Sequence, residues 1–289
     1  AGSATSQRSL EGLCVMLRVR PRILSDIMGE IDFLPLSEFR AEALGEIASV
    51  LPPSYLHQHL KGIIKPLLAT LSSSDTEESL VKASLVGTES IVRCIDEDGL
   101  YELITILCRE FDDPELCMGA ARIIQTFCST AKWNFQPYVG QLITASISVF
   151  SNAEGECLQG CWNALAAVTR SIPKEDAPKH VRVLKDAVIS AKERERRKRH
   201  GGEILVAGFC KPPKALSAVL PIYLAGLLQA SSAEIRELAA EGLGELIEVT
   251  TLATLKPSLA QITGPLIRIL GDRFPWHVKL AILCTLGIL

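Results

Sequence analysis

A dense run of cations at 192–200 is the feature of this sequence with the clearest capacity for chemistry. It contains six Lys or Arg residues and two Glu. Guanidinium and ammonium groups at that density bind carboxylates and phosphates, so the run could dock on an acidic protein surface or on a phosphate backbone. Two other interpretations compete with docking. The cations could complement the dipole at the end of a solvated helix, or they could form a nuclear localisation signal.

No set of residues predicts catalysis. Adjacent carboxylates occur at Glu77 and Glu78 and at Asp112 and Asp113, but each pair lies at the polar start of an expected helix, where caps and dipole partners are common. The sequence has no G-x-S-x-G nucleophile motif and no glycine-rich phosphate loop. We therefore expect a protein without catalytic residues, cofactor or small-molecule substrate.

The nine cysteines lie mostly in apolar runs without the spacing of a disulfide framework, which favours reduced thiols in a cytoplasmic or nuclear protein. Cys157 and Cys161 are one helical turn apart, but no histidine or further cysteine pair lies near them at the spacing of a zinc site. We expect them to pack in the core, and we expect no metal. No apolar stretch reaches the roughly 18 residues of a membrane span, and no signal peptide is visible.

Composition favours stacked helices. Hydrophobic residues make up 48% of the 289 residues, whereas aromatic residues make up only 5%. Small and aliphatic side chains in that proportion suit close helix packing better than a sheet sandwich. Alternation with a period of two never persists, so no strand is predicted. The net charge of −3 excludes a basic footprint along the whole chain, which means that any nucleic-acid contact must be local.

A similar segment recurs about every forty residues. Each copy has a polar start followed by a helix with small residues in its middle. Alignment of the copies places six residues in one column: Gly45, Gly87, Gln125, Ala166, Gly244 and Thr285. The steps between them are 42, 38, 41, 78 and 41 residues, and the long step is two periods, as expected if one copy has lost a helix. Two helices in about forty residues is the length of a HEAT or armadillo repeat.

The column of small residues predicts close contacts, because a bulky side chain there would hold two helix axes apart. Prolines near the starts or inside the intervening helices predict bends, as in the first helices of HEAT repeats: Pro66, Pro137, Pro221, Pro257 and Pro265. N-caps of second helices are expected at Asp75, Asp113 and Ser232. The predicted fold is all-α, a HEAT-repeat α-solenoid that forms a right-handed superhelix of antiparallel helix pairs.

The repeat rhythm divides the chain into four parts. Residues 1–8 are expected to be a tag or linker, 9–172 HEAT repeats, 173–213 an irregular unit, and 214–289 further HEAT repeats. The irregular unit should contain a long basic helix and then a loop laid across neighbouring helices. The apolar stripe of that helix consists of Val181, Leu184, Val188 and Ala191. Because the chain stops inside an apolar helix, we expect it to be a piece of a longer protein.

Three stretches carry a family likeness. Residues 206–228 contain a Gly-Phe-Cys turn followed by a Leu-Pro helix. Residues 9–24 and 262–289 carry further similarity to the same family of proteins, which is named below. The most specific residues are Ile262, Thr263, Gly264, Pro265, Leu266, Ile267, Arg268, Gly271, Asp272, Arg273, Phe274, Trp276, Val278, Lys279 and Ala281. Together these stretches resemble the large HEAT-repeat translational activators of the general control non-derepressible protein one family. The likeness covers essentially the whole chain and is strongest from residue 204 onward.

The resemblance implies a non-catalytic scaffold. Members of that family associate with translating or stalled ribosomes and respond to amino-acid starvation. Their C-terminal HEAT segment binds the RWD domain of the kinase that phosphorylates the α subunit of translation initiation factor two. By this likeness, residues 214–289 enter the RWD-binding segment. The helix before the Gly-Phe-Cys turn is more basic and longer than the family pattern, so kinase-contacting residues cannot be transferred one by one.

We predict that an acidic face of the RWD domain docks on cations, which would guide encounter more than they raise affinity. The first set of candidates is Arg182, Lys185, Lys192, Arg194, Arg196, Arg197, Lys198 and Arg199. The second set is Arg268 and Arg273. Two rival functions remain open. One is a generic HEAT-repeat adaptor for transport or assembly, and the other is an RNA-binding solenoid that contacts ribosomal RNA through the basic helix.

Overall fold

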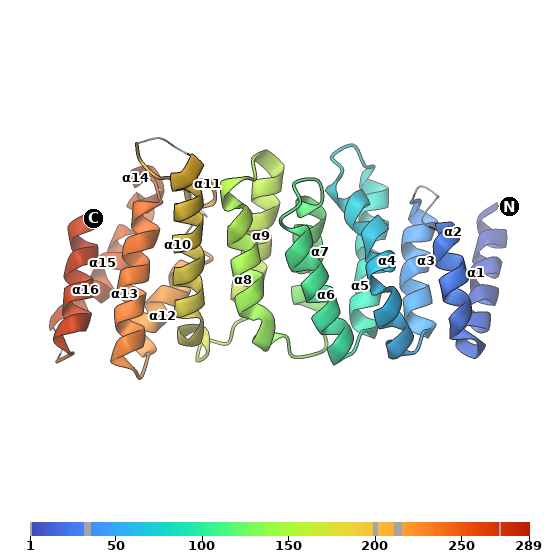
Figure 1. The fold of residues 1–289 in the computed structure, drawn as a ribbon, viewed down its shortest axis with the longest axis horizontal. Helices are drawn as coiled ribbons and strands as arrows, with labels where there is room; N and C mark the ends of the chain where they lie inside the picture. Colours follow the sequence, from blue (N-terminus) through green and yellow to red (C-terminus); the bar gives the residue numbers. More distant parts are fainter. Residues whose placement is uncertain (1, 32–35, 199–201, 211–215, 272) are drawn as a thin grey trace. The chain divides into compact units, whose positions relative to one another are not determined.

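The computed structural model describes residues 2–31, 36–198, 202–210, 216–271 and 273–289. Every regular element within these ranges is helical, which confirms the predicted all-α class (Figure 1). The chain divides into two compact units, Ala1–Phe135 and Gln136–Leu289. No helix in the described part of the chain is both long and apolar enough to cross a membrane. The right-handed superhelix stays a prediction.

The first unit consists of helices that pack side by side in two layers. In one layer α3 lies beside α5 and α5 beside α7, and in the other α4 lies beside α6. The elements are α1 (Gly2–Val19), η1 (Pro21–Ile23), α2 (Leu24–Ile31), α3 (Glu38–Val50), α4 (Pro53–Ser72), α5 (Glu78–Cys94), α6 (Glu97–Glu110) and α7 (Cys117–Thr130).

The second unit has the same helix-on-helix construction with shorter connecting elements. Its elements are η2 (Gln136–Tyr138), α8 (Val139–Ser148), η3 (Val149–Ser151), α9 (Gly155–Arg170), η4 (Ala177–His180), α10 (Val181–Lys198), α11 (Ala207–Cys210), α12 (Leu220–Gln229), α13 (Ala233–Glu248), α14 (Leu252–Leu255), η5 (Lys256–Ser258), α15 (Leu259–Gly271) and α16 (Trp276–Ile288). The cores of both units are aliphatic, as the composition predicts.

The predicted column of small residues marks helix–helix contacts in both units. A Cβ added to Gly87 of α5 would lie 2.1 Å from the carbonyl oxygen of Ala41 in α3, and a Cβ on Gly45 would lie 2.8 Å from the Cβ of Ser90. In the second unit a Cβ on Gly244 of α13 would lie 3.1 Å from Oγ1 of Thr285 in α16. Larger side chains at these points would separate the helices.

The predicted helix starts are only partly correct. Ser232 caps α13 by accepting a hydrogen bond from the amide of Glu234, as expected. Asp75 and Asp113 do not cap α5 and α7, since the capping positions are Glu77 and Leu116. The side chain of Asp113 instead accepts from the amide of Glu115 in the preceding turn. Short polar side chains stabilise turns as well as caps, so sequence alone does not separate the two roles.

Residues 2–8, expected to be a tag or linker, belong to helix α1, and Thr5 and Ser6 line a cavity with α3. Pro221, expected inside a helix, lies instead in the first turn of α12, which begins at Leu220. Proline lacks an amide hydrogen and fits that position well. Pro66 and Pro265 do lie inside helices, as predicted.

The irregular unit contains the predicted basic helix and loop. Residues 203–206 have no regular structure and lead into the single turn of α11. The amide of Val206 donates to the carbonyl oxygen of Val249, and Thr254 donates to that of Cys210, which fixes the segment against the end of α13. Phe209 is fully buried and packs edge-on against Phe150. The described part of the expected loop, residues 203–210, therefore lies against neighbouring elements of this unit.

The lost helix changes the layer in which later helices lie. Helices α8, α10, α13 and α16 are successive neighbours in one layer, and α12 lies beside α15 in the other. The end of α9 shares a cavity with α12 and α15. Between α9 and α13 the structure describes two helices of more than one turn, α10 and α12, together with the short elements η4 and α11, where two full repeats would place three full helices. Helix α13 consequently lies in the layer opposite α9, although the sequence column groups them together.

Candidate functional site

The basic helix α10 is positioned by its apolar stripe. The predicted stripe residues Val181, Leu184, Val188 and Ala191 are all fully buried. Gly140 of α8 lies directly opposite Val183, so α8 covers one side of α10. Arg182 near the start of α10 pairs with Glu234 near the start of α13, which shows that α10 and α13 run parallel. The cations on the outer side of α10 are thereby brought next to α13.

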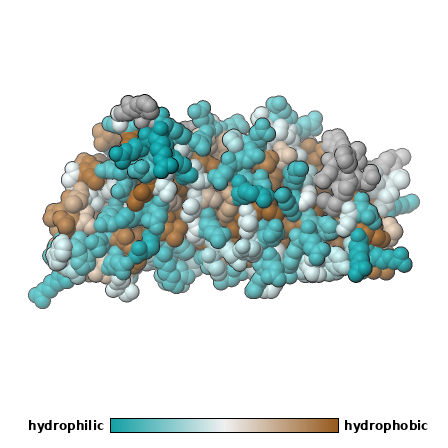
Figure 2. Space-filling view, viewed as in Figure 1, coloured by the Kyte–Doolittle hydropathy of each residue, from teal (hydrophilic) through white to brown (hydrophobic). Residues whose placement is uncertain are grey.

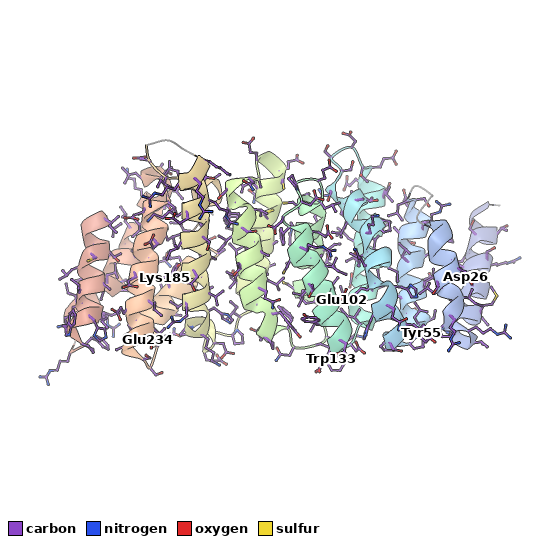
Figure 3. All side chains as sticks on the ribbon, in the orientation of Figure 1. Asp26, Tyr55, Glu102, Trp133, Lys185 and Glu234 are labelled. Carbon is purple, nitrogen blue, oxygen red and sulfur yellow. The ribbon has the colours of Figure 1, made fainter. Side chains whose placement is uncertain are left out.

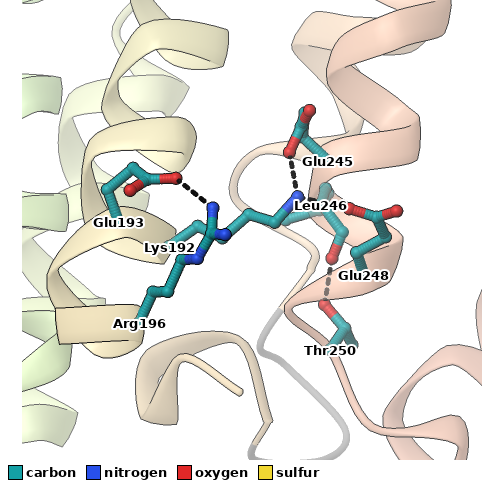
Figure 4. Close-up of polar contacts among 7 residues, drawn as sticks. All are labelled: Lys192, Glu193, Arg196, Glu245, Leu246, Glu248 and Thr250. Carbon is teal, nitrogen blue, oxygen red and sulfur yellow. Dashed lines mark hydrogen bonds and ion pairs between the residues drawn. The ribbon is translucent and has the colours of Figure 1, made fainter. Parts of the chain in front are cut away.

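Three cations of α10, at 182, 185 and 192, form ion pairs with glutamates of α13. Arg182 lies 2.5 Å from Glu234, and Lys185 pairs with Glu241. Lys192 lies 2.6 Å from Glu245 and also contacts Glu248 (Figure 4). Figure 3 labels Lys185 and Glu234, which mark the two helices that this seam joins. We call these contacts the α10–α13 seam, which consists of Arg182, Lys185, Lys192, Glu234, Glu241, Glu245 and Glu248.

Lys192 differs from the other cations of the seam because its ammonium contacts two carboxylates. Its side chain is 22% exposed and that of Lys185 is 16% exposed, whereas that of Arg182 is 56% exposed and screened by solvent. Burial lowers the pKa of Lys192, but the hydrogen bonds and negative charges of Glu245 and Glu248 outweigh this effect and raise the pKa above that of a free lysine. Lys192 therefore stays charged and joins α10 to α13 through two ion pairs.

The cations in the last turn of α10 point elsewhere. Lys198 donates to the carbonyl oxygen of Ser151 at 2.6 Å and to the side chain of Asn152, and so it caps the end of η3. Arg196 lies 3.5 Å from Glu193 of its own helix. Arg197 is exposed and forms no ion pair with another described residue. Figure 2 shows a hydrophilic patch over this end of α10. We call Arg194, Arg196 and Arg197 the α10 tip.

Arg194 differs from its two neighbours in the tip. It is half-buried, and its Nε is buried without a hydrogen-bond acceptor among the described residues. Arg199, the remaining predicted cation, lies outside the described residues. The predicted set therefore divides into a part that is paired within the molecule and a part that is presented at the helix end.

The second predicted set lies on the last helix pair. Arg268 is exposed on α15, and Arg273 is exposed in the connection to α16. Neither forms an ion pair with another residue that the structure describes. Both guanidinium groups are accessible to a partner.

The glutamates of α13 were missed at the sequence level. They occur at 234, 237, 241, 245 and 248, which is the three- and four-residue spacing of one helix face. Three of them line a groove of about 380 Å³ with Lys185 of α10 and the apolar residues Ala281 and Ile288 of α16. The regular spacing was a signal for an acidic stripe, and its match to the cation spacing on α10 was the signal for the seam.

His57 and His59 of α4 contact different polar partners. The Ser25 hydroxyl lies 3.3 Å from Nε2 of His59, a distance compatible with nucleophile and base. The carboxylate of Asp96 pairs with His57 and not with His59. The same carboxylate caps α6 by accepting a hydrogen bond from the amide of Gly99. The Asp96 carboxylate therefore serves a helix start and a helix contact.

The sequence from 33 to 213 matches the family model described as "Stalled ribosome sensor GCN1-like, HEAT repeats". The chain belongs to the GCN1 family. The match covers α3 through α11 and includes the α10 tip, and it confirms both the HEAT-repeat fold and the family that the sequence resembles.

Relatives in the GCN1 family come from plants, animals and fungi. The chain is 39% identical over 287 residues to the protein ILITYHIA of Arabidopsis thaliana and 30% identical over 296 residues to the stalled ribosome sensor GCN1 of Homo sapiens. Each alignment covers 98% of this chain and 10% of the relative. The eIF-2-alpha kinase activator GCN1 of Saccharomyces cerevisiae is 30% identical over 258 residues, which is 88% of this chain and 9% of that protein. The chain spans about a tenth of each relative.

Proposed function

We propose that this chain is a non-catalytic scaffold segment of a translational-control activator that works on ribosomes in the cytoplasm. The support is membership in the GCN1 family and the names of relatives, which describe a stalled ribosome sensor and an activator of the eIF-2-alpha kinase. A stack of helices that offers charged surface suits a protein that assembles partners. The stress signals would be amino-acid starvation and ribosome stalling.

The partner surface that we propose is the α10 tip, and its ligand is the RWD domain of the kinase. The observation that carries this choice is the division of charge along α10. Arg182, Lys185 and Lys192 already face carboxylates of α13, so a partner would have to displace those carboxylates. The tip requires no such exchange, because Arg197 is unpaired among the described residues and Arg196 has only a weak contact within its own helix. Arg268 and Arg273 are the second candidate surface.

A pull-down with the purified RWD domain tests this assignment. Arg194→Glu/Arg196→Glu/Arg197→Glu should weaken binding at least tenfold, while circular dichroism stays unchanged. The double variant Arg196→Glu/Arg197→Glu should show most of that loss, and it avoids the half-buried Arg194 in case the triple variant misfolds. The matched control is Lys61→Glu/Lys65→Glu, two exposed cations on α4. Undiminished binding by the folded double variant would remove the tip from the interface.

We favour protein binding over direct RNA binding because several of the α10 cations are already paired within the molecule. Each phosphate neutralised on a single strand adds only about 0.7 to the slope of log affinity against log salt, so tight RNA binding needs many free cations. The seam uses three of the predicted cations, and Lys198 caps η3. In a filter-binding titration with ribosomal RNA, we expect weak binding with a shallow slope. Steep salt dependence that is lost in Arg196→Glu/Arg197→Glu would support the RNA-binding alternative instead.

A further inference from the structure

A groove of about 470 Å³ lies in the second unit between the end of α9 and helix α12. The connection from Ile172 to Ala177 forms its floor together with Ile222 and Ala225 of α12. Leu228 also lines the groove, and its side chain is 43% exposed. We call this cavity the α9–α12 groove. Its volume accommodates two or three side chains of a peptide.

The α9–α12 groove lies where the repeat rhythm breaks. A four-residue 3₁₀ turn, η4, stands between α9 and α10. Helix α12 packs on η4, and Leu228 of α12 stays partly exposed. The groove is therefore bounded by α12 and by the short connection from α9 to η4.

The charge on this groove is one-sided. Arg170 and Lys174 line it, and no carboxylate does. Both side chains are exposed, and neither forms an ion pair with another residue in the described ranges. The Nε of Arg170 donates to the carbonyl oxygen of Ala166 at 2.9 Å, which holds the guanidinium at the rim and leaves its terminal nitrogens available. On α10, by contrast, cations next to a groove are matched by glutamates of α13.

We propose that the α9–α12 groove binds a short segment of a partner protein in which one or two carboxylates flank a large apolar side chain. The apolar side chain would bury against Ile222 and Leu228, where it removes exposed aliphatic surface from water. A carboxylate would reach Arg170, whose planar guanidinium suits bidentate pairing, and Lys174 would add a second positive charge. The amides of Gln229 and Gln261 line the same groove and offer hydrogen bonds to a peptide backbone. This ligand differs from the folded RWD domain proposed for the α10 tip.

The test is a selection from a phage library of random twelve-residue peptides on the whole 289-residue chain. Counter-selection on Leu228→Asp retains only peptides that need the groove. Enriched peptides should carry Asp or Glu beside Leu, Ile or Phe. Synthetic versions, measured by fluorescence anisotropy, should bind Arg170→Glu/Lys174→Glu at least tenfold more weakly than the wild type and Lys61→Glu/Lys65→Glu within twofold of it. Replacing the peptide carboxylates with lysine should restore binding to the charge-reversed variant.

Two results would overturn the proposal: no peptide enriched over the counter-selection, or enriched peptides that bind Arg170→Glu/Lys174→Glu as tightly as the wild type. Both substituted residues are exposed, so loss of fold is not expected, and the thermal melting curve of each variant verifies this. Binding of the RWD domain by Arg170→Glu/Lys174→Glu should equal that of the wild type. The two proposals can therefore fail independently.

Discussion

Lys192 of α10 lies 2.6 Å from Glu245 of α13, although 53 residues separate them in the sequence. The same ammonium contacts Glu248 one turn later (Figure 4). A cation that appears in the sequence as the start of a free basic run is therefore part of the contact between two helices. Helix α10 therefore has two roles. Its seam cations hold it to α13, and the α10 tip exposes cations to solvent.

Removal of the Lys192 ammonium should destabilise the second unit. In Lys192→Met the aliphatic stem still packs, but the two glutamates are left close together without a counter-charge, so we expect a loss of about 1–2 kcal/mol in the free energy of unfolding. Urea unfolding followed by circular dichroism measures it. A double-mutant cycle with Glu245→Gln should show coupling between the two sites.

Arg182→Met is the comparison for this prediction. Arg182 and Glu234 are both mostly exposed, so their pair should contribute no more than about 0.5 kcal/mol. Equal effects of Lys192→Met and Arg182→Met would mean that the burial of the seam does not strengthen it.

Gly87→Ala tests the close contact between α3 and α5. The added Cβ would lie 2.1 Å from the backbone oxygen of Ala41, so the helices must move apart at a cost of about 1–3 kcal/mol. Gly12→Ala in α1 is the matched control, since nothing lies within 4 Å of a Cβ there. Alanine is a better helix former than glycine by about 1 kcal/mol, so the control should gain stability in the same urea titration. A gain in both variants would contradict close packing at Gly87.

The carboxylate of Asp96 should make the first unit sensitive to acid. Burial raises the pKa of Asp96, but the Gly99 amide and His57 outweigh burial and hold the pKa below its usual value. A lowered pKa stabilises the fold above the unfolded-state value of about 4 and loses that contribution as the pH falls below it. Asp96→Asn keeps a capping oxygen and removes only the charge. Its stability should fall below the wild type at pH 6 and match it near pH 2, and a constant difference at both pH values would argue against an electrostatic role.

Much of the fold follows from local pattern. The stripe from Val181 to Ala191 predicted the buried face of α10, because side chains three and four residues apart share one side of a helix whatever lies beyond it. Gly45 and Gly87 predicted the close contact between α3 and α5, because a small residue that recurs once per repeat indicates two helix axes that lie close together. Each of these signals is a spacing of residue types that can be read along one helix.

The pairing of charges could not be obtained in the same way. Lys192 meets Glu245 because the lost helix places α10 and α13 in the same layer, and this depends on the order in which distant helices stack. The alignment of Ala166 with Gly244 already allowed for a lost helix, but it could not show that the loss moves α13 to the layer opposite α9. The α9–α12 groove likewise depends on how α12 packs on η4, which no single segment of the sequence contains.

The central claim is that the α10 tip binds the RWD domain, whereas the seam cations stay paired with α13. Hydrogen exchange measured by mass spectrometry with and without the RWD domain tests it most directly. We expect the domain to slow exchange in peptides that cover 194–198, while peptides that cover 182–192 and α13 exchange at the same rate in both states. Protection along 182–192 and α13 with none at the tip would contradict the account, because it would show that the partner binds across the seam whose charges are already paired.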